Sequence, residues 1–404
     1  MPGAKKESSN GGAHAGAGVY PSDRIRNFQN QKKEERGPIM RMMESENLFT
    51  DMYAMREHYY AEDKDRAIKA AQEDVSRAIA QEDYPINLRY LLFKLTNYCN
   101  SDCAYCSHAV NRAIPEKKHA ISHELAIKTI EDAAKMGVQA ISMSGGEPLL
   151  RKDIVSLIKK VVDCKMIPVL LTNGLLLDRC WDELGAAGLR YIVISVDSVN
   201  REVYERQRGA SFELAMKGIE AARKLRDKYG YAEIHVSAVL TKDNYEDFMD
   251  LVAYMRDRDI KVQVIPYHKR QNDAENLTIK EADKIKELTS RIIEIKKESK
   301  TIANSVGFLQ HLPDYFINGK TLPDHFACKV GYTNLCIDAY MDVKPCWSCR
   351  FEPIGNLSEK SLPEMWSSDK LVEYRKRMLR CDCEGCWYLC TSEICMMLDA
   401  HDGA

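Results

Sequence analysis

The chain has 404 residues, and its 45% content of hydrophobic residues is enough to build one large domain with a smaller appendage. The 58 basic and 60 acidic side chains leave a net charge of -2, so the composition offers no basic surface for nucleic acid or an anionic membrane. The longest apolar stretch, residues 166–177, is interrupted by Pro168 and Gly174 and is too short to span a bilayer. Because the chain begins without an apolar signal segment, we expect a cytoplasmic protein without nucleic-acid or membrane partners.

The N-terminal part of the chain carries no chemical motif. Residues 1–36 are rich in Gly, Ala, Ser and Lys with little apolar periodicity, which predicts a disordered tail. Residues 37–84 change to a helical pattern, since alanines and Val75 recur at helical spacing between Ala67 and Ala78. We predict a helical N-terminal extension that packs on the rest of the chain, with a lid or a partner-binding segment as alternatives.

From residue 85 to residue 305, apolar strand-like segments alternate with amphipathic helical ones. This alternation predicts a parallel sheet, because parallel strands need crossover helices. In such folds the reactive loops lie at the carboxyl ends of the strands. The predicted strands are 88–95, 140–144, 167–172, 191–196, 233–240 and 261–266, and the predicted helices are 122–136, 153–164, 177–187, 212–229, 245–258 and one from residue 278.

Three cysteines follow the first predicted strand with the spacing CxxxCxxC: Cys99, Cys103 and Cys106. Three thiolates on one short loop can hold three irons of a 4Fe-4S cluster and leave the fourth iron without a protein ligand. A zinc site is the alternative interpretation, with His108 as the only nearby candidate for a fourth ligand. Disulfides are disfavoured in a chain without a secretory signal.

A glycine-rich turn follows the second predicted strand, in the run from Ser144 to Pro148. Gly145 and Gly146 allow the backbone to approach a ligand closely. The carboxylate of Glu147 is a candidate acceptor for a ligand ammonium group, and Pro148 stiffens the exit of the turn. An ordinary strand-to-helix turn is the alternative.

Polar residues also end the third and fourth predicted strands. Thr172 and Asn173 follow the third strand, and Ser195 and Asp197 lie on one face at the end of the fourth. Both pairs thus lie at the carboxyl ends of strands, where reactive loops are expected in such folds. For Asp197, capping of the next helix is the alternative interpretation.

The cysteine run with Tyr105, followed by the Gly-Gly-Glu-Pro turn, resembles the radical S-adenosylmethionine (SAM) superfamily over roughly residues 86–305. Residues 144–153 and 171–174 especially resemble the molybdenum-cofactor cyclase and its relatives. The resemblance implies a partial (β/α)6 barrel and a 4Fe-4S cluster on Cys99, Cys103 and Cys106 whose open iron chelates SAM. It further implies that an electron from the cluster cleaves SAM to methionine and a 5'-deoxyadenosyl radical, which abstracts a substrate hydrogen. The residues implied to contact SAM are Tyr105, Gly145, Gly146, Glu147, Pro148, Thr172, Asn173, Ser195 and Asp197.

The C-terminal residues 306–404 contain a second group of cysteines. The segment around Cys328 and Cys346 resembles the hairpin of the auxiliary-cluster domain called SPASM, or of its shorter form, twitch, although the glycine expected in the turn is Met341. One or two auxiliary 4Fe-4S clusters are implied, with a zinc site as the alternative. The expected ligands are Cys328, Cys346, Cys383, Cys386, Cys390 and Cys395, and the further candidates are Cys336, Cys349 and Cys381, whereas Cys164 and Cys180 lie in helical patterns and are interpreted as core thiols.

Together these features predict an α/β enzyme: a partial (β/α)6 barrel of parallel strands with a small cysteine-rich auxiliary-cluster domain and a helical N-terminal extension. The resemblance implies an external electron donor such as flavodoxin or ferredoxin. Modification of a ribosomally made peptide is the favoured activity, a reaction on a sugar, aminocyclitol or other small metabolite is the alternative, and a non-catalytic electron carrier is a third hypothesis. Sulfatase maturation is disfavoured, because Trp347 rather than an aspartate follows Cys346.

Overall fold

The computed structural model describes residues 64–106, 119–230, 232–268, 276–319, 327–347, 351–380, 382 and 386–399, with side chains from residue 68 onward. The predicted tail 1–36, the first part of the predicted extension, His108, Cys349, Cys381 and Cys383 lie outside these residues. Within the described ranges, no helix combines the length and the apolar character that a bilayer crossing requires.

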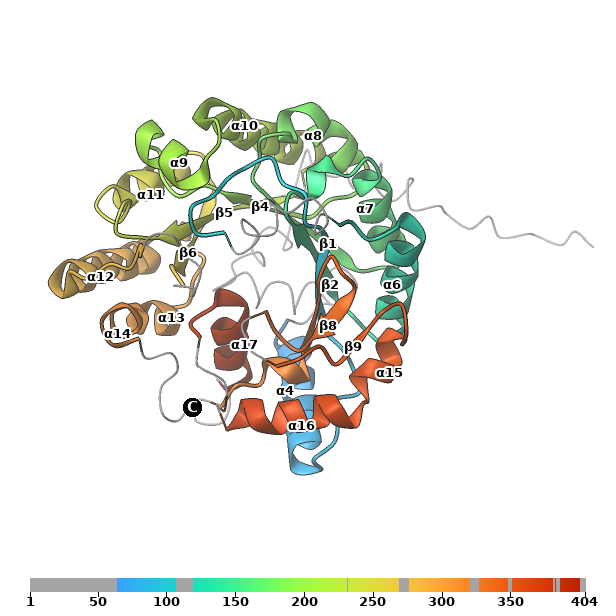
Figure 1. Cartoon of the computed structure of the whole chain (residues 1–404). Helices are drawn as coiled ribbons and strands as arrows, with labels where there is room; N and C mark the ends of the chain where they lie inside the picture. Colours follow the sequence, from blue (N-terminus) through green and yellow to red (C-terminus); the bar gives the residue numbers. More distant parts are fainter. Residues whose placement is uncertain are drawn as a thin grey trace, which may run out of the picture. The chain divides into compact units, whose positions relative to one another are not determined.

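Six parallel strands form the main part of the sheet, which curves into a barrel that is open on one side (Figure 1). Each strand pairs with the next along the chain, and all five pairings are parallel. The predicted α/β fold with a parallel sheet is therefore confirmed. The strands are β1 (Tyr90–Thr96), β2 (Ala140–Gly145), β3 (Ile167–Thr172), β4 (Tyr191–Ser195), β5 (Glu233–Leu240) and β6 (Lys261–Pro266).

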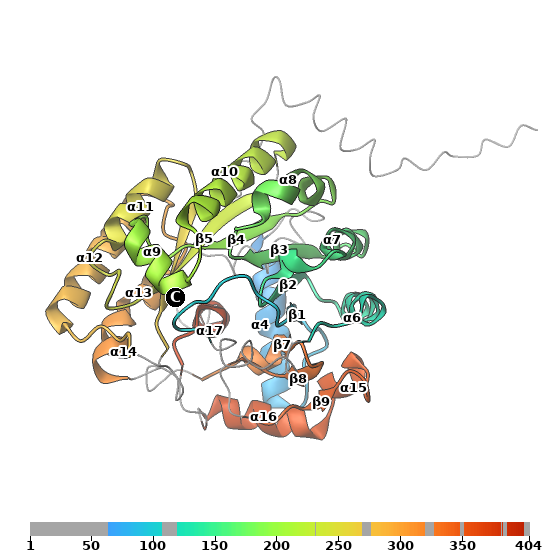
Figure 2. The same ribbon diagram turned by 45° about the horizontal axis from the view of Figure 1, so that its top comes forward.

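Helices surround the outer face of this sheet, as the predicted alternation requires (Figures 1 and 2). Their starts follow capping chemistry: the side chain of Ser122 accepts from Leu125 N, and that of Ser211 accepts from Leu214 N. A 3-10 turn, η2 (Pro148–Leu150), follows β2. The surrounding helices are α6 (His123–Lys135), α7 (Ile154–Asp163), α8 (Leu177–Ala186), α9 (Arg201–Arg208), α10 (Phe212–Tyr229), α11 (Phe248–Arg256) and α12 (Ala282–Glu298).

One of these helices, α9, was not predicted. Asn200 caps its start by accepting from the backbone N–H groups of Glu202 and Val203, and Gly209 ends it in the left-handed conformation with φ +54°. The segment is short and consists mostly of charged residues, so it lacks the apolar periodicity from which the other helices were predicted.

The C-terminal region continues the sheet of the barrel. Strand β7 (Asn334–Ile337) pairs in parallel with β1, and β8 (Asp342–Lys344) and β9 (Gly355–Asn356) follow as antiparallel neighbours. The sheet thus has nine strands in the order β6-β5-β4-β3-β2-β1-β7-β8-β9. The strand that precedes the cysteine loop therefore lies between the barrel and the C-terminal hairpin, and we retain the predicted domain boundary after residue 305 as a proposal.

The C-terminal region also contains several helices. Helix α4, from the predicted N-terminal extension, packs against one of them. α17 lies at the open side of the barrel (Figures 1 and 2), where it contacts α4, α13 and the 3-10 helix η3. These elements are α4 (Lys64–Ala80), α13 (Val306–Gln310), α14 (Leu312–Asn318), η3 (Val330–Tyr332), α15 (Leu362–Trp366), α16 (Asp369–Leu379) and α17 (Leu389–Asp399).

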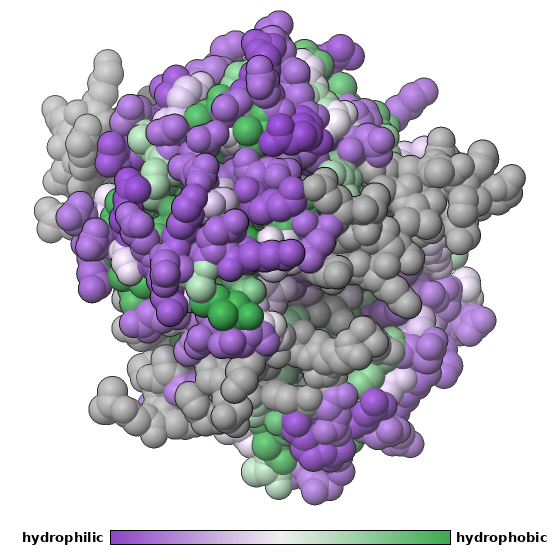
Figure 3. All heavy atoms as spheres, turned by 60° about the vertical axis from the view of Figure 1, so that its left-hand side comes forward, coloured by the Kyte–Doolittle hydropathy of each residue, from purple (hydrophilic) through white to green (hydrophobic). Residues whose placement is uncertain are grey.

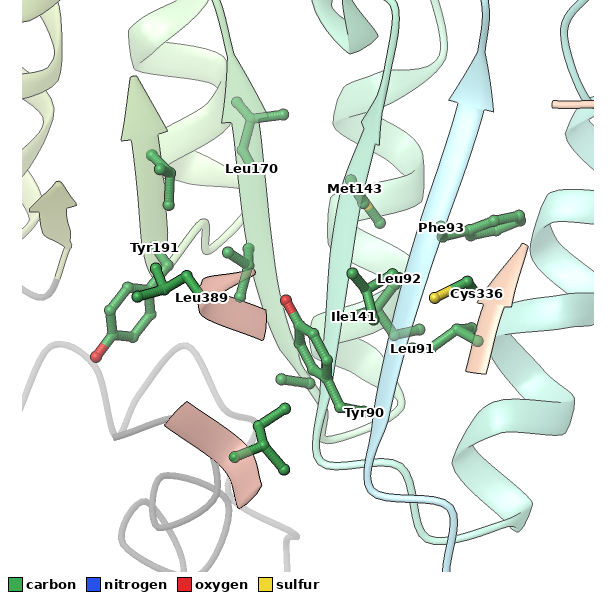
Figure 4. Close-up of a cluster of buried hydrophobic side chains, with 14 of the residues drawn as sticks. Tyr90, Leu91, Leu92, Phe93, Ile141, Met143, Leu170, Tyr191, Cys336 and Leu389 are labelled. Atoms are coloured by element: carbon green, nitrogen blue, oxygen red, sulfur yellow. The ribbon is translucent and has the colours of Figure 1, made fainter. Parts of the chain in front are cut away.

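A continuous apolar core joins these parts. Figure 4 shows a portion of it, in which Leu91 and Phe93 of β1 lie with Met143 of β2 and Leu170 of β3, all fully buried. The same cluster contains Leu389 of α17, so the C-terminal helix shares the core of the barrel. By contrast, in Figure 3, which brings the side of α11, α12 and α14 forward, the described residues on the visible face are mostly hydrophilic.

Candidate active site

The three-cysteine loop leaves β1 at the mouth of the barrel, where the carboxyl ends of the parallel strands meet. Cys103 is 9% exposed, and Cys99 and Cys106 are half-buried. Burial raises the pKa of Cys103 to about 11, with further contributions in the same direction from Cys106 and Cys99, so both of these thiols lie within electrostatic reach of Cys103. Three thiols on one loop fit the three protein ligands of a 4Fe-4S cluster with an open iron.

A site for a single metal ion, such as zinc, is the alternative to an iron-sulfur cluster. Among the residues that the structure describes, no group of three or more His, Cys, Asp or Glu side chains is placed to hold one metal ion. The fourth zinc ligand considered from the sequence, His108, lies outside those residues.

The two glycines of the turn after β2 bring it against the start of the cysteine loop. The backbone N–H of Gly146 donates to Thr96 O, and that of Glu147 donates to Tyr98 O, both at 2.7 Å. A Cβ on Gly145 would lie 2.0 Å from Thr96 O, and one on Gly146 would lie 2.1 Å from Tyr98 O. Close approach was predicted toward a ligand, but the structure shows it toward the chain itself. Glycine is needed at both positions because a Cβ atom would clash with the backbone of the cysteine loop, which this turn supports.

We expect Gly146→Ala to lower SAM cleavage by about a hundredfold, because a side chain that displaces a catalytic loop by about 1 Å has an effect of that size. The added Cβ must push the backbone at Tyr98 away. Gly319→Ala is the matched control: Gly319 has φ +61°, but a Cβ on it would meet none of the described atoms within 4 Å, so strain is added without a clash. Rates of 5'-deoxyadenosine formation by the two variants test this, and equal rates would contradict it.

Glu147 is completely buried and binds protein groups with both carboxylate oxygens. Oε1 accepts from Leu149 N at 3.0 Å and from the hydroxyl of Thr172 at 2.8 Å, and Oε2 accepts from Asn173 N at 2.7 Å. In this structure its side chain fastens the turn to the end of β3. The role of Glu147 as an acceptor for a ligand ammonium group stays a prediction. Burial raises the pKa of Glu147 to about 7, against the lowering effect of these hydrogen bonds.

This raised pKa makes the stability depend on pH. Because the folded state binds the Glu147 proton more tightly than the unfolded state, Glu147 lowers the free energy of unfolding as pH rises from about 4.5 to about 7, by on the order of 3 kcal/mol. We expect Glu147→Gln to remove this decrease, so the variant gains stability relative to wild type between about pH 5.5 and about pH 8. Urea unfolding of iron-free protein at both pH values measures it, with the exposed Glu124→Gln as control; parallel pH profiles for wild type and Glu147→Gln would refute it.

Asn173 joins the end of β3 to the cysteine loop. Its side-chain amide donates to Asn100 Oδ1 at 2.8 Å and to Ser101 Oγ at 3.0 Å, and lies 3.9 Å from Cys99 Sγ. The hydroxyl of Thr172 accepts from Gly174 N at 3.0 Å while it donates to the buried carboxylate. Both residues were predicted as SAM-binding, and in this structure both support the loop. An amide beside a cysteine sulfur also influences the potential of a cluster bound there.

Asp197 holds the second half of the loop. The hydroxyl of Tyr105 donates to its Oδ2, and its Oδ1 accepts from Arg208 Nη2 at 2.6 Å and from Val239 N at 2.8 Å. Asp197 is completely buried and does not cap α9, a role that Asn200 fills. The predicted SAM-binding residue is thus the centre of a buried network that contains the aromatic residue of the cysteine motif.

The end of α9 completes this support. The backbone N–H of Asp102 donates to Arg208 O at 3.2 Å, and that of Ala104 donates to Gln207 O at 2.9 Å. Burial has the largest single effect and lowers the pKa of Arg208, but the combined effects of Asp197, Tyr105 and Cys103 outweigh it and raise the pKa well above its ordinary value. Sequence reasoning missed Arg208 and Gln207. The only signal was Gly209 as a helix stop, and nothing in it indicated a contact with a loop about 100 residues earlier in the chain.

The other predicted residues at the mouth have simpler positions. Ser195 is half-buried at the end of β4, where it pairs with Ser237 of β5. Pro148 is buried at the first position of η2.

The structure brings several C-terminal cysteines together. Lys329 N donates to Cys395 Sγ at 3.2 Å. Desolvation raises the pKa of Cys390 to about 12, with Cys386 and Cys328 contributing in the same direction, so both of these thiols lie within electrostatic reach of Cys390. Cys346 is buried just after β8. Cys336 lies in β7 opposite Leu92, within the apolar cluster of Figure 4, and Cys164 and Cys180 are half-buried at the end of α7 and on α8.

A parallel barrel that is open on one side, with three cysteines at its mouth and further cysteines in the added C-terminal region, is the arrangement expected of an iron-sulfur barrel protein. Residues 93–235 match the family model of the radical SAM superfamily, and residues 328–387 match that of SPASM, an iron-sulfur cluster-binding domain. The chain therefore belongs to the radical SAM superfamily and carries a C-terminal SPASM domain. The family predicted from the motifs is confirmed, and its cofactors are 4Fe-4S clusters and SAM.

Curated relatives and solved structures point to different members of the superfamily. A GTP 3',8-cyclase from Peptoclostridium acidaminophilum is 32% identical over 199 residues, which are 47% of this chain and 58% of that protein. This chain thus spans little more than half the length of that relative. A probable GTP 3',8-cyclase from Methanocaldococcus jannaschii is 28% identical over 64% of this chain and 85% of its own length. The structure of Streptococcus suis SuiB bound to its precursor peptide SuiA has a TM-score of 0.59, with 20% identity over 77% of this chain and 72% of that one, a likeness of fold alone.

Proposed function

We propose that this protein reductively cleaves SAM to a 5'-deoxyadenosyl radical and uses it to abstract a hydrogen from a ribosomally made peptide or related natural product. The observation that carries the proposal is the anchoring of the three-cysteine loop by the ends of β2, β3 and α9. An electron carrier needs thiol ligands alone, whereas this mouth carries a supported loop beside a glycine turn that matches the SAM-binding motif.

The residues at the mouth have separate tasks. Cys99, Cys103 and Cys106 would hold the cluster, which supplies the electron for SAM cleavage when bound. Gly146 and Asn173 fix the first half of the loop, and Asp197 fixes the second half through Tyr105 and Arg208. Such fixed positions keep a reactive carbon close to one chosen hydrogen and away from water. An external reductant such as flavodoxin or ferredoxin would supply the electron.

The C-terminal cysteines would hold one or two auxiliary clusters. In support, Cys386 and Cys328 lie within electrostatic reach of Cys390, Lys329 N donates to Cys395 Sγ, and Cys346 is buried just after β8. An auxiliary cluster at this place would accept or relay an electron, or bind substrate, in the second half of the reaction. With a peptide substrate, the product of this reaction would be a crosslink, a thioether or an epimer of a peptide residue.

Two substrate classes have separate support. For a peptide, the support is that SuiB, which shares the fold over most of this chain, was solved with a precursor peptide. For a small metabolite, which is the second candidate, the support is the sequence similarity to GTP 3',8-cyclases. With a small metabolite, the reaction would be dehydrogenation, epimerisation or decarboxylation of a sugar, an aminocyclitol or a comparable small molecule.

The test uses full-length protein that is purified and reconstituted with iron and sulfide without oxygen, and then reduced with dithionite in the presence of SAM. We expect 5'-deoxyadenosine by liquid chromatography, and faster formation when the true substrate is added. GTP and short peptides encoded beside the gene are the first probes. Acceleration by GTP would favour the second candidate, acceleration by a peptide the first, and a reconstituted protein that forms no 5'-deoxyadenosine would refute the proposed activity.

A further inference from the structure

The turn of the C-terminal hairpin is held in one conformation. The side chain of Asp338 accepts from Tyr340 N at 2.9 Å, and Asn356 Nδ2 donates to Tyr340 O at 3.0 Å. Met341 has φ +72°, a left-handed conformation that is rare for a residue with a side chain. Such a conformation persists only where the surrounding contacts impose it. The hairpin therefore presents the side chain of Tyr340 in a fixed direction.

This hydroxyl meets the segment that leads into the first cysteine loop. Asn97 Nδ2 donates to the hydroxyl of Tyr340 at 2.8 Å, and Asn97 is only 3% exposed. Asn97 Oδ1 accepts from His119 N at 2.5 Å, and the imidazole ring of His119 stacks on the ring of Tyr340 with 5.8 Å between centroids. Asn97 precedes Cys99 by two positions, so the hairpin touches the loop close to its first cysteine.

A second contact from the same hairpin reaches the same segment. Nζ of Lys94 lies 3.7 Å from the centroid of the Trp347 ring, a cation–π distance. Trp347 directly follows Cys346, which is one of the candidate ligands of the second group. The β1–β2 pairing shifts its register between Lys94 and Thr96, so the two contacts lie on either side of an irregularity in β1.

Attachment of the hairpin to the barrel does not need these contacts. Four residues of β1, Tyr90–Phe93, already pair with β7 in parallel. The contacts at Lys94 and Asn97 begin where that pairing ends, and they join the surroundings of one cysteine group to those of the other.

We propose that the hairpin is a positioning device, in which Tyr340 fixes the segment before Cys99 and so couples the conformation of the first cysteine loop to the state of the C-terminal cysteine group. Tyr340 acts through Asn97 and need not touch SAM or substrate. The inference goes beyond the proposed function and does not depend on which substrate is used.

The test is hydrogen exchange, followed by mass spectrometry, of reconstituted full-length protein with the variants Tyr340→Phe and Tyr254→Phe. We expect the backbone amides in residues 95–106 to exchange about fivefold faster in Tyr340→Phe, the factor expected for one lost hydrogen bond. Tyr254→Phe is the matched control on α11, far along the chain from both cysteine groups, and should exchange as wild type does. The EPR spectrum of the reduced first cluster with SAM should also change in Tyr340→Phe alone.

Coupling is tested by adding Cys346→Ala to wild type and to Tyr340→Phe. If the hairpin transmits the state of the second group, Cys346→Ala speeds exchange in residues 95–106 of wild type but adds little to Tyr340→Phe, because coupled changes are not additive. Wild-type exchange and EPR spectra in Tyr340→Phe, or additive effects in the double variant, would overturn the inference. Should Tyr340→Phe fail to fold, Trp347→Leu tests the same coupling through the second contact. None of these measurements requires turnover, so they stand apart from a failure of the proposed activity.

Discussion

Replacing Cys103 with alanine is expected to abolish formation of 5'-deoxyadenosine. Cys103 is the most buried of the three loop cysteines, and its loss leaves two thiols where three are needed. The backbone of the loop is held from three sides by other residues, so the variant should fold and lack iron only at this site. Iron analysis, EPR spectroscopy and the deoxyadenosine assay on reconstituted protein measure the effect.

Two comparisons make this result specific. Cys180→Ala removes a half-buried thiol on α8 and should leave 5'-deoxyadenosine formation unchanged. Cys346→Ala should retain part of the uncoupled SAM cleavage while product formation is lost, because Cys346 belongs to the second group. A full deoxyadenosine yield from Cys103→Ala would contradict the assignment of the first site.

The second large effect is expected from Arg208→Met. Arg208 and Asp197 form a buried ion pair at 2.6 Å, with side chains 9% and 0% exposed. Removing one partner of such a pair leaves an uncompensated buried charge and lowers the free energy of unfolding by about 3–5 kcal/mol. The same change frees the carboxylate that orients Tyr105, so we also expect poor incorporation of iron into the first site. Urea unfolding and iron content are the measurements.

Arg201→Met on the same helix is the control. Arg201 is half-exposed and pairs with Glu213 at the surface, where an ion pair contributes about 1 kcal/mol or less. The prediction fails if the two arginine variants lose similar amounts of stability, or if Arg208→Met takes up iron as wild type does.

The parallel sheet was predictable because strand-like segments alternate with amphipathic helical ones along the chain. The segments 167–172, 233–240 and 261–266 coincide with β3, β5 and β6. The pairing of β7 with β1 was not predictable, since it joins residues more than 240 positions apart and β7 is only four residues long. A short strand in a cysteine-rich segment gives no periodic signal that identifies its neighbour.

The residues of the site were easier to find than their roles. Glycines, carboxylates and amides at strand ends marked the mouth of the barrel, but spacing alone could not separate a group that faces a ligand from one that faces the chain. Glu147 illustrates this, because its three protein donors come partly from β3, some 25 residues away. At Met341 the resemblance led us to expect glycine, and the residue that stands there nevertheless has φ +72°, a left-handed conformation.

The position of β1 in the middle of the nine-stranded sheet has a practical consequence for dissecting the molecule. A fragment that stops at residue 305 would strip β1 of its partner β7 and leave its N–H and C=O groups open along one side. Bare strand edges of this kind recruit other chains and promote aggregation. The barrel strands are thus unsuited to expression without the C-terminal region, and an uncovered edge of β1 is sufficient reason for such a fragment to lose solubility.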